Sequence, residues 1–503
     1  MIWRKKCLGP FLACVIFVLM VGIASAATSS APSTAGGAGT LNTTPVAINN
    51  DVNNDPNAGI RQRGEVITPP VGLPNGGVFI NADGVLASVR LVPGPLPVQQ
   101  TTSALPSDIA RKSEMRLISL NRLEQAIIDN NGKITEEMRY LCGILRLKYV
   151  FFYEETGDIV VGGPAEGWTV GRDGAIVGQS TGLPVLELED LVVALRAYPA
   201  NGSKTGVVGC SIDPTTEGLA RMQAFTRNFG PMSSNPYEAE QQKVRFVNGI
   251  RETLGYHDIR VDGIAPNTHL AQILVAADYR MKLIGLGFEN PGVRMATYIA
   301  NANPASMGNN ALIRWYFVPD YECVKKTDDG NAIEFVGNGV KLVDEAEMVK
   351  ASGERRSAGR TNRASQQFVK SFTSQYPKIA RAAPVYAQLR NVIDMLVCAA
   401  HIQKEGFYEK SGWSMEYLGC ETNFPTETYR TPERVDSVVA RVDGSNGTQF
   451  GAPVSGGVVI QPENALDTNL AKASDKQLIE KTKERVRLDL APGQWWWDVD
   501  LKK

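Results

Sequence analysis

The chain has 503 residues, 43% of them hydrophobic, so it is long enough to bury a large core and to form several domains. Its 52 basic and 53 acidic residues nearly balance, without the basic excess that a nucleic-acid-binding surface requires. We therefore expect no nucleic-acid partner.

The first 26 residues have the three parts of an export signal. Residues 4–6 (Arg-Lys-Lys) form a basic start, an apolar run follows, and residues 24–26 (Ala-Ser-Ala) offer the small side chains that signal peptidase selects. The apolar run is short for a membrane span, which needs about 20 apolar residues. We expect a cleaved signal peptide and a soluble product in the periplasm, in the cell envelope or outside the cell. The alternative is an uncleaved anchor; no later segment looks able to cross a bilayer.

After the signal, the composition divides the chain into four further regions. Residues 27–74 are rich in Ala, Ser, Thr, Gly, Asn and Pro, which bury too little apolar surface to offset chain entropy, so we expect a flexible leader. We expect an N-terminal α+β region over residues 75–200 and a C-terminal α/β region with long helices over 201–428. Residues 429–503 are expected to form a polar extension that carries a terminal helix and a tryptophan cluster.

Three pairs of alternating strands flank Asp-Gly dipeptides, at residues 83–84, 173–174 and 329–330. Glycine tolerates the positive φ that tight hairpin turns need, so these pairs predict β-hairpins. Capping residues and apolar periodicity predict helices between and after them. The expected helical segments are 107–131, 135–146, 186–198, 214–229, 237–254, 270–287, 384–406 and 474–488. Asp213 is the expected cap of segment 214–229, and Pro214 suits its first position.

Strands and helices therefore mix without strict alternation, which favours an α+β fold with mixed sheets and packed helices. The mature chain would keep five cysteines, an odd number, so at least one thiol is free or pairs between chains. The spacing does not determine their pairing. These cysteines are Cys142, Cys210, Cys323, Cys398 and Cys420.

The segment 273–287 (ILVAADYRMKLIGLG) predicts a helix that is apolar on nearly all sides yet carries charges in its middle. Asp278 and Lys282 are four residues apart and can pair, whereas Arg280 needs a carboxylate from elsewhere. Charges in a covered helix are costly unless they are paired. We favour a structural role for these pairs. The alternative is a buried acid–base cluster of Asp278 and His269.

Residues 178–182 (GQSTG) match the G-x-S-x-G pattern of a hydrolase nucleophile. That elbow needs a helix to begin at the serine, and Pro184 disfavours a helix here. We favour a plain loop. A secreted hydrolase remains an alternative function, with Ser180, His269 and Asp278 as its candidate residues.

Two further groups of side chains have a structural and a functional interpretation. Cys398, His401 and Glu405 share one helix face, but a zinc site usually needs a further ligand from elsewhere, so we favour helix packing and expect no metal or cofactor. The adjacent Trp495, Trp496 and Trp497 cannot all face one side of a strand. We favour docking onto the chain's own core; the alternative is a surface that binds carbohydrate or protein.

Four blocks carry a resemblance to a known family: residues 163–196 (GPAEGWTVGRDGAIVGQSTGLPVLELEDLVVALR), 210–223 (CSIDPTTEGLARMQ), 266–287 (PNTHLAQILVAADYRMKLIGLG) and 314–322 (RWYFVPDYE). Together they resemble exported proteins of unknown function from planctomycete bacteria, over about residues 75–420. The resemblance implies no activity, cofactor or site residue. We therefore expect a binding or structural role in the cell envelope, with an unknown envelope protein or polysaccharide as the partner.

Overall fold

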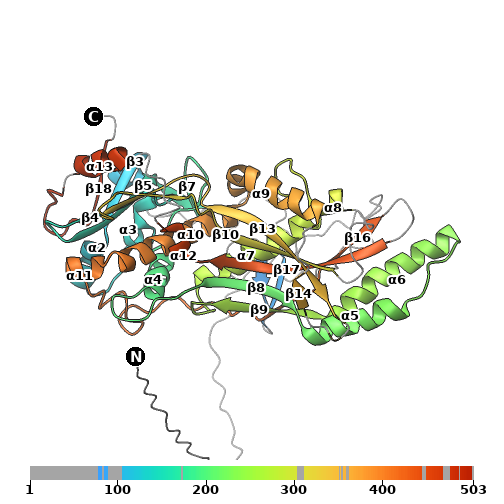
Figure 1. Cartoon of the computed structure of the whole chain (residues 1–503). Helices are drawn as coiled ribbons and strands as arrows, with labels where there is room; N and C mark the ends of the chain where they lie inside the picture. Colours follow the sequence, from blue (N-terminus) through green and yellow to red (C-terminus); the bar gives the residue numbers. More distant parts are fainter. Residues whose placement is uncertain are drawn as a thin grey trace, which may run out of the picture. The chain divides into compact units, whose positions relative to one another are not determined.

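The computed structural model describes residues 78–81, 84–88, 105–171, 174–302, 311–350, 352, 355–357, 362–443, 449–467, 476–486 and 488–500 (Figure 1). The expected signal peptide and leader lie outside these residues. All the described residues fall within one compact unit, Gly59–Lys503. None of the described helices has the length and apolar character that a bilayer span requires.

The larger sheet mixes parallel and antiparallel strands. Its members are β1 (Val78–Ile80), β2 (Val85–Ser88), β8 (Val208–Pro214), β9 (Tyr256–Asp262), β10 (Ala311–Pro319), β13 (Val340–Val349), β14 (Arg355–Ser357), β15 (Arg434–Asp436), β16 (Val439–Asp443) and β17 (Gln449–Ile460). They follow the order β1-β2-β15-β9-β8-β17-β10-β13-β14, and β16 pairs with β17 beside this path. The pairs β2/β15 and β10/β17 are parallel, and the other pairs are antiparallel.

The smaller sheet is antiparallel throughout. It follows the order β11 (Val324–Lys326), β12 (Ala332–Phe335), β4 (Tyr149–Tyr153), β5 (Asp158–Ala165), β3 (Ser113–Ser119) and β18 (Trp496–Asp498). A separate hairpin joins β6 (Trp168–Val170) to β7 (Ile176–Gly178). This combination of sheets with many helices confirms the expected α+β class.

Helices cover both sheets and pack on one another (Figure 1). Their bounds are α1 (Ser107–Ala110), α2 (Leu120–Asp129), α3 (Glu136–Arg139), α4 (Leu188–Ala197), α5 (Thr216–Asn228), α6 (Pro236–Leu254), α7 (His269–Gly285), α8 (Tyr298–Asn301), α9 (Arg363–Ala382), α10 (Pro384–Lys404), α11 (Phe407–Ser411), α12 (Pro462–Ala465) and α13 (Lys476–Arg485), with a 3-10 turn η1 (Leu141–Gly143). Helix α7 contacts β8, β10 and β17 of the larger sheet and also the helices α4 and α10.

Helix α7 is therefore enclosed, and every one of its residues except Arg280 is buried. The Lys282 ammonium lies 2.5 Å from Asp278 Oδ2 and donates to the carbonyl of Gly456, 3.2 Å away. Arg280 pairs with Glu289 at 2.7 Å. The expected pairing of Asp278 with Lys282 is thus confirmed, and Glu289 is the carboxylate that Arg280 was expected to need.

A glycine lets β17 lie in the middle of the larger sheet. Gly456 has φ of +115°, which favours glycine, and a Cβ there would lie 1.9 Å from the carbonyl oxygen of Trp315. Its own carbonyl accepts the Lys282 hydrogen bond. This residue therefore combines close strand packing with a partner for a buried ammonium group.

The three expected hairpins are present as β1/β2, β6/β7 and β11/β12. In each, a glycine with positive φ donates its N–H to the carbonyl three residues earlier: Gly84 to Asn81, Gly174 to Gly171 and Gly330 to Thr327. The turns therefore span four residues rather than the two that an Asp-Gly loop alone would give.

Two expectations about local structure were wrong. The predicted helix over residues 107–131 is interrupted by β3, which β5 and β18 pair on both sides; periodicity alone does not separate such a covered strand from a buried helix. Helix α5 is capped by the Thr215 hydroxyl, which accepts from Gly218 N at 2.9 Å, and not by Asp213. Pro214 ends β8 instead of opening the helix.

Residues 429–503, expected as a polar extension, supply β15, β16, β17 and β18 to the two sheets. Strand β17 lies between β8 and β10, at the centre of the larger sheet, because its small residues allow close packing. The expected boundaries near residues 200 and 428 stay predictions. All five described cysteines are free thiols; Cys420 is half-buried and the others are buried.

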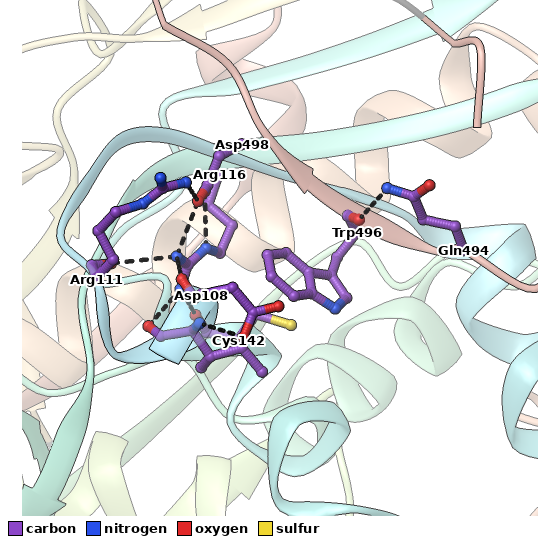
Figure 2. A network of polar contacts seen from close by, with 8 residues as sticks. Asp108, Arg111, Arg116, Cys142, Gln494, Trp496 and Asp498 are labelled. Carbon is purple, nitrogen blue, oxygen red and sulfur yellow. Dashed lines mark hydrogen bonds and ion pairs between the residues drawn. The ribbon is translucent and has the colours of Figure 1, made fainter. Parts of the chain in front are cut away.

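One buried arginine fixes strand β18 at the edge of the smaller sheet (Figure 2). The Arg116 side chain is fully buried, and its Nε and Nη2 donate to the two carboxylate oxygens of Asp498 at 2.9 and 3.1 Å. Its remaining N–H groups donate to the backbone carbonyls of Asp108, Ile109, Arg111 and Cys142. The guanidinium also lies 5.1 Å from the ring centroid of Trp496.

We expect Arg116→Ala to lower the free energy of unfolding by about 3–5 kcal/mol, because it removes the buried partner of the Asp498 carboxylate and the donor to four backbone carbonyls. Chemical denaturation measures this loss. Arg111→Ala is the matched control: Arg111 binds the same carboxylate, but its side chain is 67% exposed, so it should lose less than about 1 kcal/mol. Equal losses in the two variants would contradict the assignment.

Candidate functional site

Ser180 lies on an exposed turn that folds around a buried carboxylate. The backbone N–H groups of Ser180 and Thr181 donate to Glu166 Oε1 at 3.2 and 2.8 Å, and the Thr181 hydroxyl donates to the same oxygen at 2.7 Å. No helix begins at Ser180. The turn therefore wraps around the Glu166 carboxylate and is a loop, as expected, and not a nucleophile elbow.

Asp278 and His269 lie nine residues apart on α7, which places them about 13 Å apart along the helix axis. Each has a different partner, Lys282 for Asp278 and Asp190 for His269. Burial raises the pKa of Asp278 to about 6, although Lys282 opposes this shift. The structure thus does not bring the three hydrolase candidates together.

The group Cys398, His401 and Glu405 is not assembled as a ligand set in the described part of the chain. Glu405 binds the Lys326 ammonium at 2.9 Å. His401 packs edge-on against Phe407, with ring centroids 5.2 Å apart, and burial lowers its pKa to about 3. His401 is therefore a neutral residue of the core.

The terminal tryptophans dock on the chain's own core. Trp495 and Trp497 are buried, and the half-buried Trp496 stacks near Arg116 (Figure 2). Trp495 and Trp497 therefore offer no exposed ring, and a binding role for the half-buried Trp496 stays a prediction.

A different set of polar residues meets at a small pocket between α4, α7 and α10. Val185, Leu186, Ile273 and Met395 form its apolar lining, and Glu187, Asp190, Gln388 and Asn391 form its polar lining. The pocket has room on the order of one water molecule. It is the place where polar side chains from separate helices converge.

Helix starts bring the charged residues of this pocket together. His269 is the first residue of α7, which Thr268 caps by accepting from Ala271 N. Glu187 precedes α4 without capping it through its side chain, and Asp190 lies in the first turn of α4. Carboxylates are favoured near a helix N-terminus, where the backbone N–H groups carry a partial positive charge.

The imidazole of His269 lies between the two carboxylates. Its Nδ1 is 3.0 Å from Asp190 Oδ2 and 3.9 Å from Glu187 Oε2. Among the described residues, Glu187, Asp190 and His269 are the group whose donor atoms could surround a metal ion, since these atoms lie within 4.8 Å of one another. The ring of Tyr429 packs beside His269, with centroids 5.6 Å apart.

Burial and neighbouring charges shift the pKa values of the groups around His269. Burial alone would lower the pKa of His269, but Asp190 and Glu187 outweigh it and raise that pKa to about 10. Burial raises the pKa of Glu187, and burial with the neighbouring Asp190 raises the pKa of Glu189 to about 7. His269 is therefore protonated at neutral pH when no cation competes for its ring nitrogen.

Three buried oxygens of the pocket have no hydrogen-bond donor among the described residues: Asp190 Oδ1, Gln388 Oε1 and Asn391 Oδ1. The orientation of Asn391 is fixed because its amide N–H donates to the Leu145 carbonyl at 3.0 Å. Buried acceptors without donors are costly. The pocket is thus rich in acceptors and matches a ligand that brings positive charge or several donors.

The sequence contained signals for this site that pattern analysis missed. Glu187 and Asp190 are three residues apart, as are Gln388 and Asn391, and the latter pair interrupts a long apolar helix. His269 was singled out, but with Asp278 rather than Asp190 as its partner. Residues 79 positions apart carry no local pattern that would pair them.

Comparison with known proteins gives a family match of limited extent. Residues 210–298 match the family model described as a protein of unknown function (DUF1598). This confirms the expected family of unknown function over a shorter segment, from within β8 to the first residue of α8; the planctomycete origin stays a prediction. No curated protein and no solved structure matches the chain. His269 and the pocket residue Ile273 lie inside the matched segment.

The opposite pKa shifts of two buried histidines predict opposite pH dependences. The folded state raises the pKa of His269 above the unfolded value of about 6.5, so its contribution is full below that pH and is lost as pH rises toward about 10. The free energy of unfolding should therefore fall on the alkaline side by at most about 1.4 kcal/mol per pH unit. We expect His269→Gln to remove this fall. Urea unfolding across this pH range in EDTA measures it.

His401 provides the control because its folded pKa is lowered to about 3. Its contribution is full above about pH 6.5 and is lost as pH falls toward 3. His401→Leu should flatten the acid side and leave the alkaline side unchanged. An alkaline slope that survives His269→Gln would show that the imidazole between Asp190 and Glu187 is not its source.

Proposed function

We propose that the protein is an exported binding protein that holds a small cationic ligand in the polar pocket between α4, α7 and α10. The observation that carries this proposal is the set of three buried oxygens without donors, beside the carboxylates of Glu187 and Asp190. Oxygen acceptors and negative charge together favour a cation or a donor-rich ammonium group.

The chemistry of the lining supports binding over hydrolysis. A hydrolase that works through a covalent intermediate needs a nucleophile beside its base. The pocket lining contains carboxylates, amides and apolar side chains, so it lacks the serine nucleophile of the expected hydrolase. Asp278 is paired with Lys282, and the backbone of Ser180 binds Glu166. The hydrolase alternative therefore has less support than the binding role.

The size of the pocket limits the ligand. Space on the order of one water molecule suits a metal ion, ammonium or the end of a methylammonium group. A sugar ring does not fit such a volume. The pocket thus favours a small cation, and the burial of Trp495 and Trp497 removes the main support for a carbohydrate surface.

Export is supported by the basic start, the apolar run and the Ala-Ser-Ala site of residues 1–26. We expect the mature protein to begin at Ala27. N-terminal sequencing of protein recovered from outside the cytoplasm of the expressing bacterium measures this end. A chain that retains residues 1–26 in the membrane fraction would contradict cleavage and favour the anchor.

Ligand binding can be tested with Gln388→Met, because the side-chain oxygen of Gln388 accepts no hydrogen bond among the described residues and methionine has a similar shape. Isothermal titration with Mn²⁺, Zn²⁺, Ca²⁺, ammonium and methylammonium covers the small cations. At least one should bind the wild type, and Gln388→Met should weaken it roughly ten- to hundredfold, as expected for losing an acceptor of a charged donor.

Glu427→Gln is the matched control, because it removes a nearby negative charge that is 60% exposed and outside the pocket lining. Its affinity should stay within about twofold of wild type, since exposed charges are screened. If Glu427→Gln weakens cation affinity as much as Gln388→Met does, the loss of affinity is due to general surface charge and not to the pocket. Failure of all five cations to bind would overturn the proposal.

A further inference from the structure

We infer that Glu187, Asp190 and His269 are ligands of a divalent transition-metal ion. The inference rests on the proposed cation-binding function and names the class of cation. It joins two independent observations: the convergence of one imidazole and two carboxylates, and the buried amide oxygens of Gln388 and Asn391 in the pocket that both carboxylates line.

The distances between the donor atoms suit one shared ion. Atoms about 2.1 Å from a metal lie roughly 3.0 to 3.4 Å from one another in octahedral or tetrahedral sites. Here His269 Nδ1 lies 3.0 Å from Asp190 Oδ2 and 3.9 Å from Glu187 Oε2. The oxygens of Glu187 and Asp190 lie within 4.8 Å of each other, so binding of one ion requires the Glu187 carboxylate to move closer to the other two atoms. No capping hydrogen bond holds the Glu187 side chain in its present place.

The kind of donor selects the kind of metal. Carboxylate and amide oxygens alone suit Ca²⁺ or Mg²⁺, whereas an imidazole nitrogen suits Zn²⁺, Fe²⁺, Co²⁺ and Ni²⁺. The set of His269, Asp190 and Glu187 is therefore that of a first-row transition metal. The amide oxygens of Gln388 and Asn391 line the same pocket and offer further oxygen ligands.

An ion pair between His269 and Asp190 accounts for only part of the arrangement. It uses Asp190 Oδ2 and leaves Asp190 Oδ1, Gln388 Oε1 and Asn391 Oδ1 buried without a donor. A purely structural pair gains nothing from these oxygens, because each one adds a desolvation cost. A metal ion that takes the place of the proton on His269 Nδ1 would bring a positive charge to the carboxylates that share the pocket with these amide oxygens.

The other histidines in the core do not offer such a set. His401 lies among apolar side chains, and the Glu405 carboxylate that follows it on α10 is bound to Lys326. Cys398 is buried on the same helix, and burial raises the pKa of its thiol, so a thiolate ligand is disfavoured there. His401 thus provides a control for binding by any buried histidine.

To test this inference, the purified protein is freed of metal with EDTA, dialysed and titrated with Co²⁺. The visible absorption of bound Co²⁺ reports its ligation by nitrogen and oxygen. Wild type should bind one Co²⁺ per chain. His269→Gln and Asp190→Asn should each weaken binding by more than about a hundredfold, because even the loss of a ligand's hydrogen-bond partner costs 10- to 100-fold. His401→Phe should keep both the stoichiometry and the spectrum.

Folding of each variant is checked by circular dichroism, and Gln388→Met serves as a second pocket variant that keeps all three ligands. Methylammonium is titrated in parallel. Methylammonium binding without Co²⁺ binding would overturn the metal assignment and leave the proposed function standing. Absence of both would overturn the two together. Co²⁺ binding that His269→Gln does not weaken would also overturn the assignment, because the imidazole would then not be a ligand.

Discussion

The enclosure of α7 is the constraint on which much of this structure depends. A helix packed against a sheet on one side and against α4 and α10 on the other has no solvent for its charged side chains. Each charge must then find an opposite charge within the protein. Asp278 and Lys282 meet this requirement within one turn of the helix, Arg280 meets it with Glu289, and His269 meets it with Asp190 from α4.

The balance between hydrogen-bond donors and acceptors differs between the middle and the start of α7. In the middle, one ammonium faces one carboxylate and one backbone carbonyl, so charges and donors nearly balance. At the start, the carboxylates of Glu187 and Asp190 lie beside a single imidazole, and two amides of α10 line the same pocket as these carboxylates. One oxygen of Asp278 is without a donor among the described residues, whereas three oxygens of the pocket are. This difference separates a helix clamp from a place that favours a ligand.

Local patterns in the sequence were enough to predict what is decided within a few residues. The i, i+4 pair of Asp278 and Lys282, the extent of α10 and the three hairpins all follow from spacing and turn residues. Strand β3 was missed because a strand covered on both faces has no alternation to read.

The pocket was missed for a different reason, because its residues come from three helices far apart in the sequence. His269 and Asp190 are 79 positions apart, and only the fold brings them to 3.0 Å. The importance of residues 429–503 was hidden in the same way: glycine and small polar residues look like a linker, yet in β17 they permit close packing between β8 and β10.

The late position of β17 and β18 in the chain has a consequence for the order of folding. The larger sheet has no bond between its β8 and β10 sides until residues 449–460 arrive, and Arg116 has no carboxylate until Asp498 does. The larger sheet therefore stays divided between β8 and β10 until β17 pairs with both, and the edge of the smaller sheet lacks its partner until β18 pairs with β3. Because these contacts join residues far apart in the sequence, we expect this fold to form slowly.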